Sequence, residues 1–147
     1  MSGAAALLAV ARRRVWFGIG DSAHLAASAD HRCAVLGLPS QAVSAGSHLT
    51  ALLPSLGAGD CLVVISQSGR TRPAAGALRA SGVPVIGLTS VATSPLAKLS
   101  DYLLLTPPSD FIVGDSPYTV RAAQALVIDA LLLEAGTRRG TRIEGWS

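Results

Sequence analysis

The sequence predicts an α/β fold in which helices cover both faces of a parallel sheet. The main observation is that five short apolar runs alternate with segments that have helical composition, which is the pattern of successive βαβ units. The chain has 147 residues, of which 50% are hydrophobic and 14% are charged. This length suits one domain, and this composition excludes disorder as the main state of the chain.

The first half of the chain shows this alternation with glycines at the element ends. Val15-Trp16-Phe17 is a short apolar run that Gly18 stops, and an alanine-rich segment ends near Gly37. Glycine commonly ends both helices and strands because it tolerates backbone conformations that other residues avoid. The predicted elements are a helix over 4–13, a strand over 15–17, a helix over 22–36, a strand over 42–43 and a helix over 47–56.

The second half contains the segment that most resembles a central strand. Cys61 to Ile65 is a continuous apolar run, which is typical of a strand buried on both faces. Pro84 is expected at the mouth of the next strand, where the hydrogen-bond ladder tolerates it. The remaining predicted elements are a helix over 71–81, a strand over 83–88, a helix that Ser94-Pro95 begins, a strand over 102–105 and a helix from Ser116-Pro117 to about Glu134, closed by Gly136.

The predicted fold places function in the loops that follow the strands, because α/β sheets bind ligands beyond the carboxyl ends of their strands. The first such loop, Gly18-Ile19-Gly20-Asp21-Ser22, opens a helix whose free amides and dipole favour an anion. With Ala23 in the third glycine position it passes as a dinucleotide fingerprint. The second strand, however, ends without the carboxylate that such a fingerprint requires, which argues against a nicotinamide cofactor. No cofactor is predicted.

The second loop, Ser66-Gln67-Ser68-Gly69-Arg70-Thr71, is the more informative one because three hydroxyls fall within six residues directly after the buried strand. Hydroxyls and amides can bind the oxygens of a phosphate without a buried cation, and each hydrogen bond to a charged group contributes about 1.5–3 kcal/mol. Ordinary helix capping is the alternative explanation. The third loop, Thr89 to Pro95, follows the predicted strand over 83–88. Its Ser94 is explained as a helix cap, and Thr89 and Ser90 either face the ligand or serve the fold.

These motifs, taken in order, resemble the SIS (sugar isomerase) domain family. The resemblance runs from Val15 to Leu133 and rests on the two loops above, on Asp60, and on Ser94-Pro95-Leu96-Ala97 with Asp101. It implies a five-stranded parallel, flavodoxin-like α/β/α sandwich that binds phosphorylated sugars, usually as a dimer or tetramer. The family positions assign the sugar phosphate to Ser22, Ser66, Ser68 and Thr71, with Gly20 and Gln67 beside them.

The segment from Ala122 to Leu131 looks most like the sugar-sensing half of RpiR-type transcription regulators. The expected boundaries are an N-terminal helix over 1–13, the SIS domain over 14–136 and a tail over 137–147. The expected function is therefore binding of a phosphorylated sugar by a sensing module.

The alternative function is a phosphosugar aldose–ketose isomerase, which needs a base to remove a proton beside the carbonyl. Related isomerases commonly place a glutamate near the start of the last helix, but the two glutamates here, Glu134 and Glu144, lie elsewhere. Asp115 and His48 are the remaining candidates, and each has a simpler structural explanation, as a helix-dipole partner and as a surface residue.

The partners expected from the sequence are a phosphorylated sugar and further copies of the chain. The last helix is apolar nearly all round, so one face is expected to cover the sheet and another to bind a second copy in a homodimer or homotetramer. Arg12–Arg14 and the arginines near 138–142 are read as solvated ends, and the 4% aromatic content argues against direct nucleic-acid binding. No membrane span and no metal site are predicted, and Cys33 and Cys61 are expected to be buried free thiols, which fits the cytoplasm.

Overall fold

A computed structural model describes residues 1–71, 73–107 and 118–140, and it confirms the predicted α/β sandwich. The five strands form one parallel sheet with the order β2-β1-β3-β4-β5. This order is the flavodoxin-like one, and its direction reverses between β1 and β3. The two strands are in register from Arg14 beside Cys61 to Phe17 beside Val64, so the loops that follow them start side by side.

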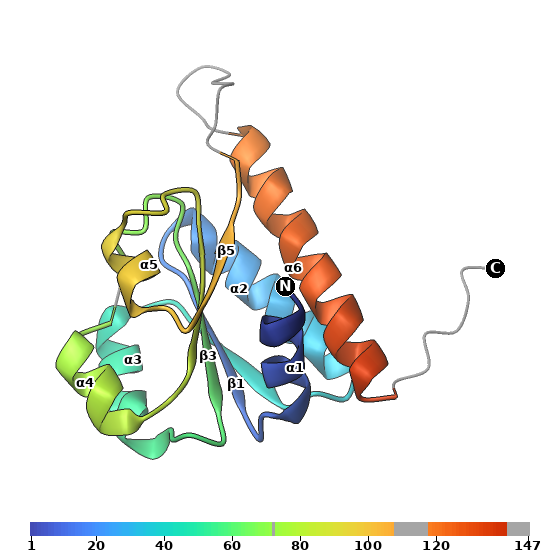
Figure 1. Cartoon of the computed structure of the whole chain (residues 1–147), viewed down its shortest axis with the longest axis horizontal. Coiled ribbons are helices and arrows are strands. Elements are labelled where there is room, and N and C mark those ends of the chain that lie inside the picture. The colour runs from blue at the N-terminus through green and yellow to red at the C-terminus, as the bar shows by residue number, and fades with distance from the viewer. Residues whose placement is uncertain (72, 108–117, 141–147) are drawn as a thin grey trace.

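The elements alternate along the chain as the sequence predicts (Figure 1). The strands are β1 (Arg14–Phe17), β2 (Ser40–Val43), β3 (Cys61–Ile65), β4 (Val85–Thr89) and β5 (Tyr102–Leu105). The helices are α1 (Ser2–Val10), α2 (Asp21–Val35), α3 (Gly46–Leu52) with the short 3₁₀ helix η1 (Leu53–Ser55), α4 (Ala75–Ser81), α5 (Pro95–Leu99) and α6 (Tyr118–Arg138).

Several helix boundaries differ from the prediction, and helix α1, for example, ends at Val10 rather than at residue 13. Helix α4 begins at Ala75 rather than at residue 71, and the backbone of Ala74 before it is extended. Helix α6 continues through Gly136 to Arg138. A Cβ atom on Gly136 would lie 3.2 Å from the Leu36 side chain, so this glycine allows α6 to approach the end of α2 instead of ending the helix. The prediction that Gly136 closes the last helix is therefore wrong.

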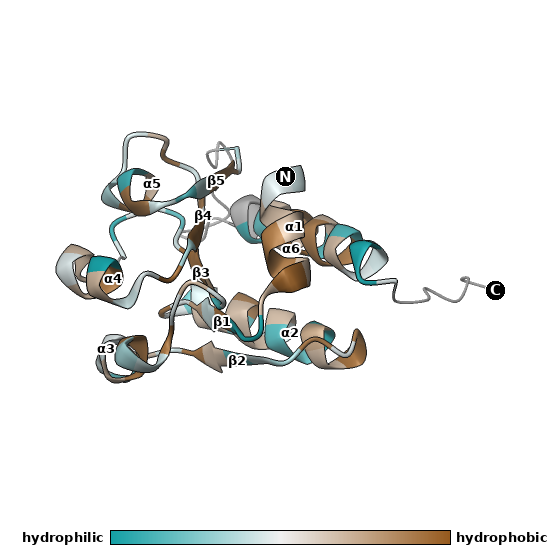
Figure 2. Cartoon of the chain, turned by 60° about the horizontal axis from the view of Figure 1, so that its bottom comes forward, coloured by the Kyte–Doolittle hydropathy of each residue, from teal (hydrophilic) through white to brown (hydrophobic). Residues whose placement is uncertain are grey.

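Helices cover both faces of the sheet, and each face has its own hydrophobic cluster (Figures 1 and 2). Successive strand residues point to opposite faces, so Val63 and Ile65 lie in one cluster while Leu62 and Val64 lie in the other. The first cluster is shared with α1, α2 and α6, and the second is shared with α3, α4 and α5. Both cysteines are free and buried, as predicted.

Helix α1 is an integral part of the first cluster, because Ala4, Ala5 and Leu8 are fully buried there. Arg14 fixes its C-terminal end. The buried guanidinium donates hydrogen bonds to the carbonyls of Leu8 (2.6 Å), Ala9 (3.3 Å) and Pro39 (3.2 Å). The expectation of a solvated end is wrong for Arg14, since these carbonyls at the end of α1 need donors that the helix itself cannot supply.

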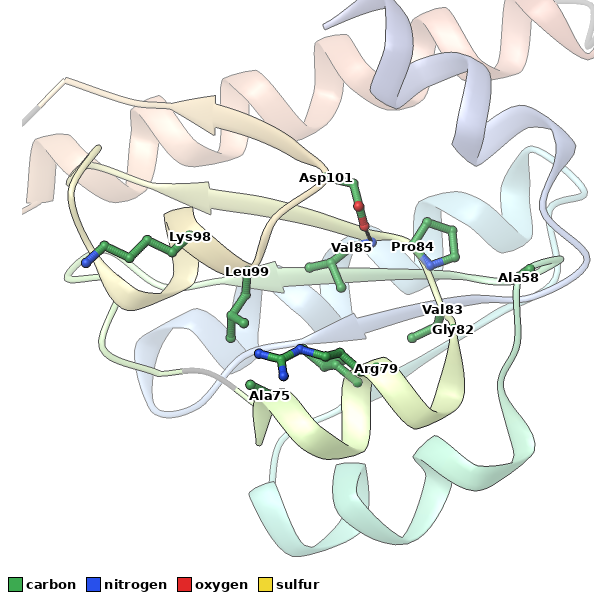
Figure 3. Close-up of a pocket in the computed structure, with 11 residues that line it drawn as sticks. Ala58, Ala75, Arg79, Gly82, Val83, Pro84, Val85, Lys98, Leu99 and Asp101 are labelled. Atoms are coloured by element: carbon green, nitrogen blue, oxygen red, sulfur yellow. Dashed lines mark hydrogen bonds between the residues drawn. The ribbon is translucent and has the colours of Figure 1, made fainter.

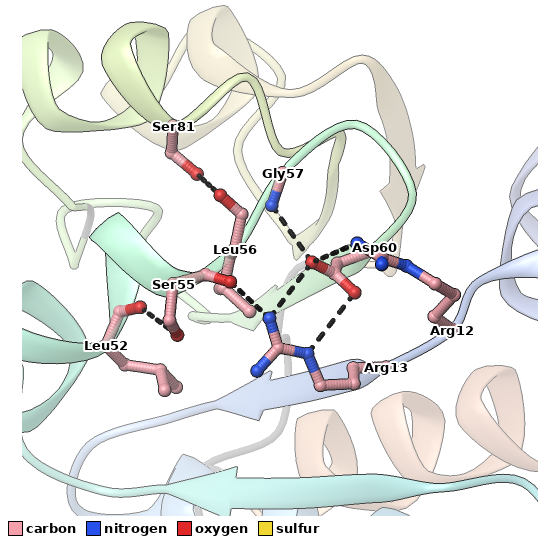
Figure 4. Close-up of polar contacts among 8 residues, drawn as sticks. All are labelled: Arg12, Arg13, Leu52, Ser55, Leu56, Gly57, Asp60 and Ser81. Atoms are coloured by element: carbon pink, nitrogen blue, oxygen red, sulfur yellow. Dashed lines mark hydrogen bonds and ion pairs between the residues drawn. The ribbon is translucent and has the colours of Figure 1, made fainter.

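Asp60 forms a second polar cluster at the amino end of β3 (Figure 4). Its fully buried carboxylate accepts hydrogen bonds from Arg13, at 3.3 and 3.4 Å, and from the amide of Gly57 at 2.9 Å. Arg12 lies 3.7 Å away. Burial alone would raise the pKa of Asp60, but these hydrogen bonds and the two positive charges hold the pKa below its usual value. This cluster joins β1 to β3 at the edge of the sheet opposite to the predicted site.

Candidate functional site

The loops after β1 and β3 meet at the carboxyl edge of the sheet, where the sequence predicts the site. In the first loop, Gly18 is required by close packing, because a Cβ atom there would lie 2.4 Å from the carbonyl oxygen of Ser22. Gly20 has a φ of 61°, a conformation that side chains disfavour, and it directly precedes Asp21, the first residue of α2. Ser22 is half-buried in the first turn of this helix.

The second loop turns sharply at Gly69, whose φ is 70°. The amide of Gly69 donates to the Ser66 hydroxyl oxygen at 3.1 Å, and the amide of Arg70 donates to the Ser68 hydroxyl oxygen at 3.2 Å. Because both oxygens act as acceptors in these bonds, the O–H groups remain able to donate. Ser66 is buried and Ser68 is exposed.

The loop after β4 holds the Ser66–Thr71 loop in place from one side. The Gln67 carbonyl accepts from the Thr89 hydroxyl at 3.0 Å and from the Ser90 amide at 3.1 Å. A Cβ atom on Gly69 would lie 2.1 Å from the Ser94 hydroxyl oxygen, so only glycine fits. Thr89 and Ser90 thus serve the fold.

Ser94 caps α5 as predicted, accepting from the Ala97 amide at 3.2 Å. The Leu96 amide donates to the Gly69 carbonyl at 3.0 Å. These bonds occupy amides at the start of α5 and tie this helix to the turn of the Ser66–Thr71 loop.

The backbone amides of Gly20, Asp21, Gln67 and Ser68 at this edge make no hydrogen bond within the described part of the chain. The first pair begins α2, and the second pair forms the tip of the Ser66–Thr71 loop. Free amides at a helix start and in a tight loop are a usual means by which proteins bind an oxyanion. Helix α4 contributes nothing to this arrangement, because it begins four residues beyond Thr71.

The remaining candidates have different positions. Thr71 is half-buried at the end of the second loop. His48 is exposed on α3, the helix that follows β2. Asp115 and the Ser116-Pro117 signal lie outside the described residues, so the question of a catalytic base at Asp115 stays a prediction.

The structure adds one contact that could not be predicted from the sequence. Arg121, in the first turn of α6, forms an ion pair with Asp21 at the start of α2. The two residues are 100 positions apart, and charge patterning along a chain predicts only neighbours on one helix. This pair places the beginning of α6 beside the first loop.

A separate groove of about 550 Å³ lies between α4 and α5 (Figure 3). Its lining includes Leu78, Val85 and Leu99, with Arg79 and Lys98 at the rim. None of the predicted phosphate-binding residues lines this groove. It is therefore distinct from the site at the carboxyl edge.

Within residues 1–71, 73–107 and 118–140, no helix is long and apolar enough to cross a membrane. The same ranges contain no group of three or more His, Cys, Asp or Glu side chains placed to hold a metal ion.

Comparison with known proteins identifies the family. The SIS domain matches residues 7–134. The HTH-type transcriptional regulator HexR of Pseudomonas aeruginosa is 39% identical over 141 residues, which is 91% of this chain and 48% of that protein. The chain thus spans about half the length of this relative.

Solved structures agree with this assignment. The sugar isomerase domain of an RpiR transcription factor from Sphaerobacter thermophilus superposes with a TM-score of 0.76 at 26% identity, covering 94% of this chain and 77% of that one. NanR of Vibrio vulnificus, solved in complex with ManNAc-6P, has a TM-score of 0.80 at 20% identity, with coverage of 92% and 53%. The chain is a member of the SIS domain family, with homology to RpiR- and HexR-type regulators.

Proposed function

We propose that this chain binds a phosphorylated sugar at the carboxyl edge of its sheet and acts as the ligand-sensing part of a regulator. The observation that carries the proposal is that the loops after β1 and β3 start side by side and both carry unpaired amides, those of Gly20, Asp21, Gln67 and Ser68, while the second loop adds hydroxyls that can still donate. Support also comes from the relative NanR, whose structure holds ManNAc-6P, and from HexR, a transcriptional regulator.

The phosphate of the sugar is assigned to the two loops. The amides of Gln67 and Ser68 and the hydroxyls of Ser68 and Thr71 approach it from one side, and Ser22 and the amide of Gly20 approach it from the other. Ser66 contributes its O–H group while its oxygen holds the Gly69 amide. Neutral donors suit a ligand that binds reversibly, because they stabilise its charge without a buried cation.

The position of Glu134 favours sensing over isomerisation. This residue lies near the C-terminal end of α6, where it forms an ion pair with Arg138 at 3.2 Å, far from the carboxyl edge of the sheet. It is therefore not placed to remove a proton from a sugar in the proposed site.

The test is to mix the whole chain with ManNAc-6P, glucose 6-phosphate, fructose 6-phosphate, arabinose 5-phosphate and inorganic phosphate. Thermal shift and titration calorimetry measure binding, and a coupled assay or NMR follows aldose–ketose conversion. We expect at least one sugar phosphate to bind more tightly than inorganic phosphate and to be recovered unchanged. Rapid interconversion would establish the isomerase instead, and absence of binding throughout would overturn the proposal.

We further propose that two copies associate through α6 and that the protein works in the cytoplasm. Leu126 and Leu133 are 70% and 53% exposed on the outer face of this helix, where a surface helix normally carries polar residues. Burial of these leucines against a second copy would remove apolar surface from water. The two buried free thiols fit a reducing compartment.

A further inference from the structure

The buried polar side chains near the carboxyl edge have partners, with one exception. Ser66, Thr89, Ser94 and Thr106 are all buried, and the side chain of each has a hydrogen-bond partner. Gln124 is 2% exposed, and its amide nitrogen has no partner among the described residues. A buried N–H donor without an acceptor destabilises the fold, so such a group in a native structure calls for an explanation.

The position of Gln124 on α6 supplies an explanation for its unpaired amide. Gln124 lies in the buried row of the helix that continues through Ile128, Leu132 and Ala135, all of which belong to the first hydrophobic cluster. Among these four residues Gln124 is the polar one, and it is the nearest to the end of α6 that lies toward the carboxyl edge of the sheet (Figure 1). A core-facing amide is expected there only if something polar reaches it.

The ion pair between Arg121 and Asp21 places this part of α6 beside the first loop of the site. Gln124 follows Arg121 by three residues, which is about 4.5 Å along the axis and on the same side of the helix. Asp21 itself carries one of the unpaired amides at the carboxyl edge. Gln124 therefore lies in the part of α6 that adjoins the first loop of the site.

We propose that the carboxamide of Gln124 donates a hydrogen bond to a hydroxyl or carbonyl oxygen of the sugar, which makes Gln124 a specificity-determining residue. This inference rests on the proposed function and deepens it, because the loops bind the phosphate that all sugar phosphates share, whereas Gln124 contacts the part that differs. It also makes α6 the element that contacts both the sugar and, through Leu126 and Leu133 on its opposite face, the second copy of the chain.

The experiment compares wild type with Gln124→Met, which keeps the size of the side chain and removes its donors. Titration calorimetry measures the affinity for the best-binding sugar phosphate of the panel above and for inorganic phosphate. We expect about a tenfold loss for the sugar phosphate, as for one lost hydrogen bond, and less than a twofold change for inorganic phosphate. Gln41→Met, on the edge strand β2, is the matched control and should change neither affinity.

Thermal unfolding without ligand separates recognition from a structural role. If the ligand is the partner of Gln124, the methionine variant is at least as stable as wild type when empty, because an unpaired buried donor has been removed. Lower stability with unchanged sugar affinity would show that Gln124 serves the fold and would overturn the inference. An equal loss for sugar phosphate and inorganic phosphate would overturn it too. If wild type binds no sugar phosphate, the proposed function itself fails.

Discussion

At the scale of single residues, the proposed site is built from groups that carry no charge. Ser68 is exposed at the tip of its loop, and its oxygen already accepts from the Arg70 amide, so its O–H group remains able to donate to a ligand. Ser66 is buried and shapes the turn. The sequence predicts the same role, phosphate binding, for all these hydroxyls. In the structure the Ser68 hydroxyl is accessible, whereas the buried Ser66 hydroxyl also holds the turn of the loop.

The Ser68 hydroxyl is expected to contribute directly to affinity. Ser68→Ala removes one charge-assisted hydrogen bond and should weaken binding of a sugar phosphate roughly tenfold or more in a calorimetric titration. Ser81→Ala is the matched control, because its hydroxyl donates to the Leu56 carbonyl at 3.0 Å, outside both site loops. Equal affinities for the two variants would remove Ser68 from the site.

Asp60 is expected to link stability to acid pH. Its folded-state pKa is lowered, so its contribution to stability is present above the unfolded pKa of about 3.9 and is lost as the pH falls through the folded value. Wild type should therefore unfold at a higher temperature than Asp60→Asn at pH 7, and the difference should shrink steadily below about pH 4. A difference that stays constant down to pH 2.5 would contradict this assignment.

At the scale of elements, apolar runs predict the strands well because a central parallel strand is buried on both faces whatever its neighbours are. Cys61–Ile65 is found as predicted, and β4 begins one residue after Pro84. The helix ends are less predictable. Gly136 predicts the end of the last helix, but in the structure it lies within α6 and allows this helix to pack closely against the Leu36 side chain. The site shows the same limit, since the loops follow from the strands but the Arg121–Asp21 contact depends on how α6 packs.

The position of helix α1 depends on the planar guanidinium of Arg14, whose N–H groups donate to three carbonyls. A lysine cannot donate to three carbonyls in that arrangement, so Arg14→Lys should lower the free energy of unfolding by about 1–3 kcal/mol in urea. The control is Arg12→Lys, whose side chain is 74% exposed and whose carboxylate contact is 3.7 Å long. If both variants unfold at the same urea concentration as wild type, the carbonyl contacts of Arg14 do not hold α1.

At the scale of the whole molecule, the proposed dimer is tested at the outer face of α6. Leu126→Glu should convert a dimer into a monomer in sedimentation experiments while leaving the monomer folded, because residue 126 contributes nothing to the core. Val35→Glu, at the end of α2 and 74% exposed, is the control and should remain dimeric. A wild-type chain that is monomeric at micromolar concentration would exclude this interface.

The central claim is that an oxyanion binds between the loops that follow β1 and β3. The most direct test is an amide NMR spectrum of the ¹⁵N-labelled chain titrated with a sugar phosphate. The account predicts that the largest shifts occur at the amides of Gly20, Asp21, Gln67 and Ser68, which lack partners in the empty protein. Shifts confined to the groove between α4 and α5, around Arg79 and Lys98, would contradict it.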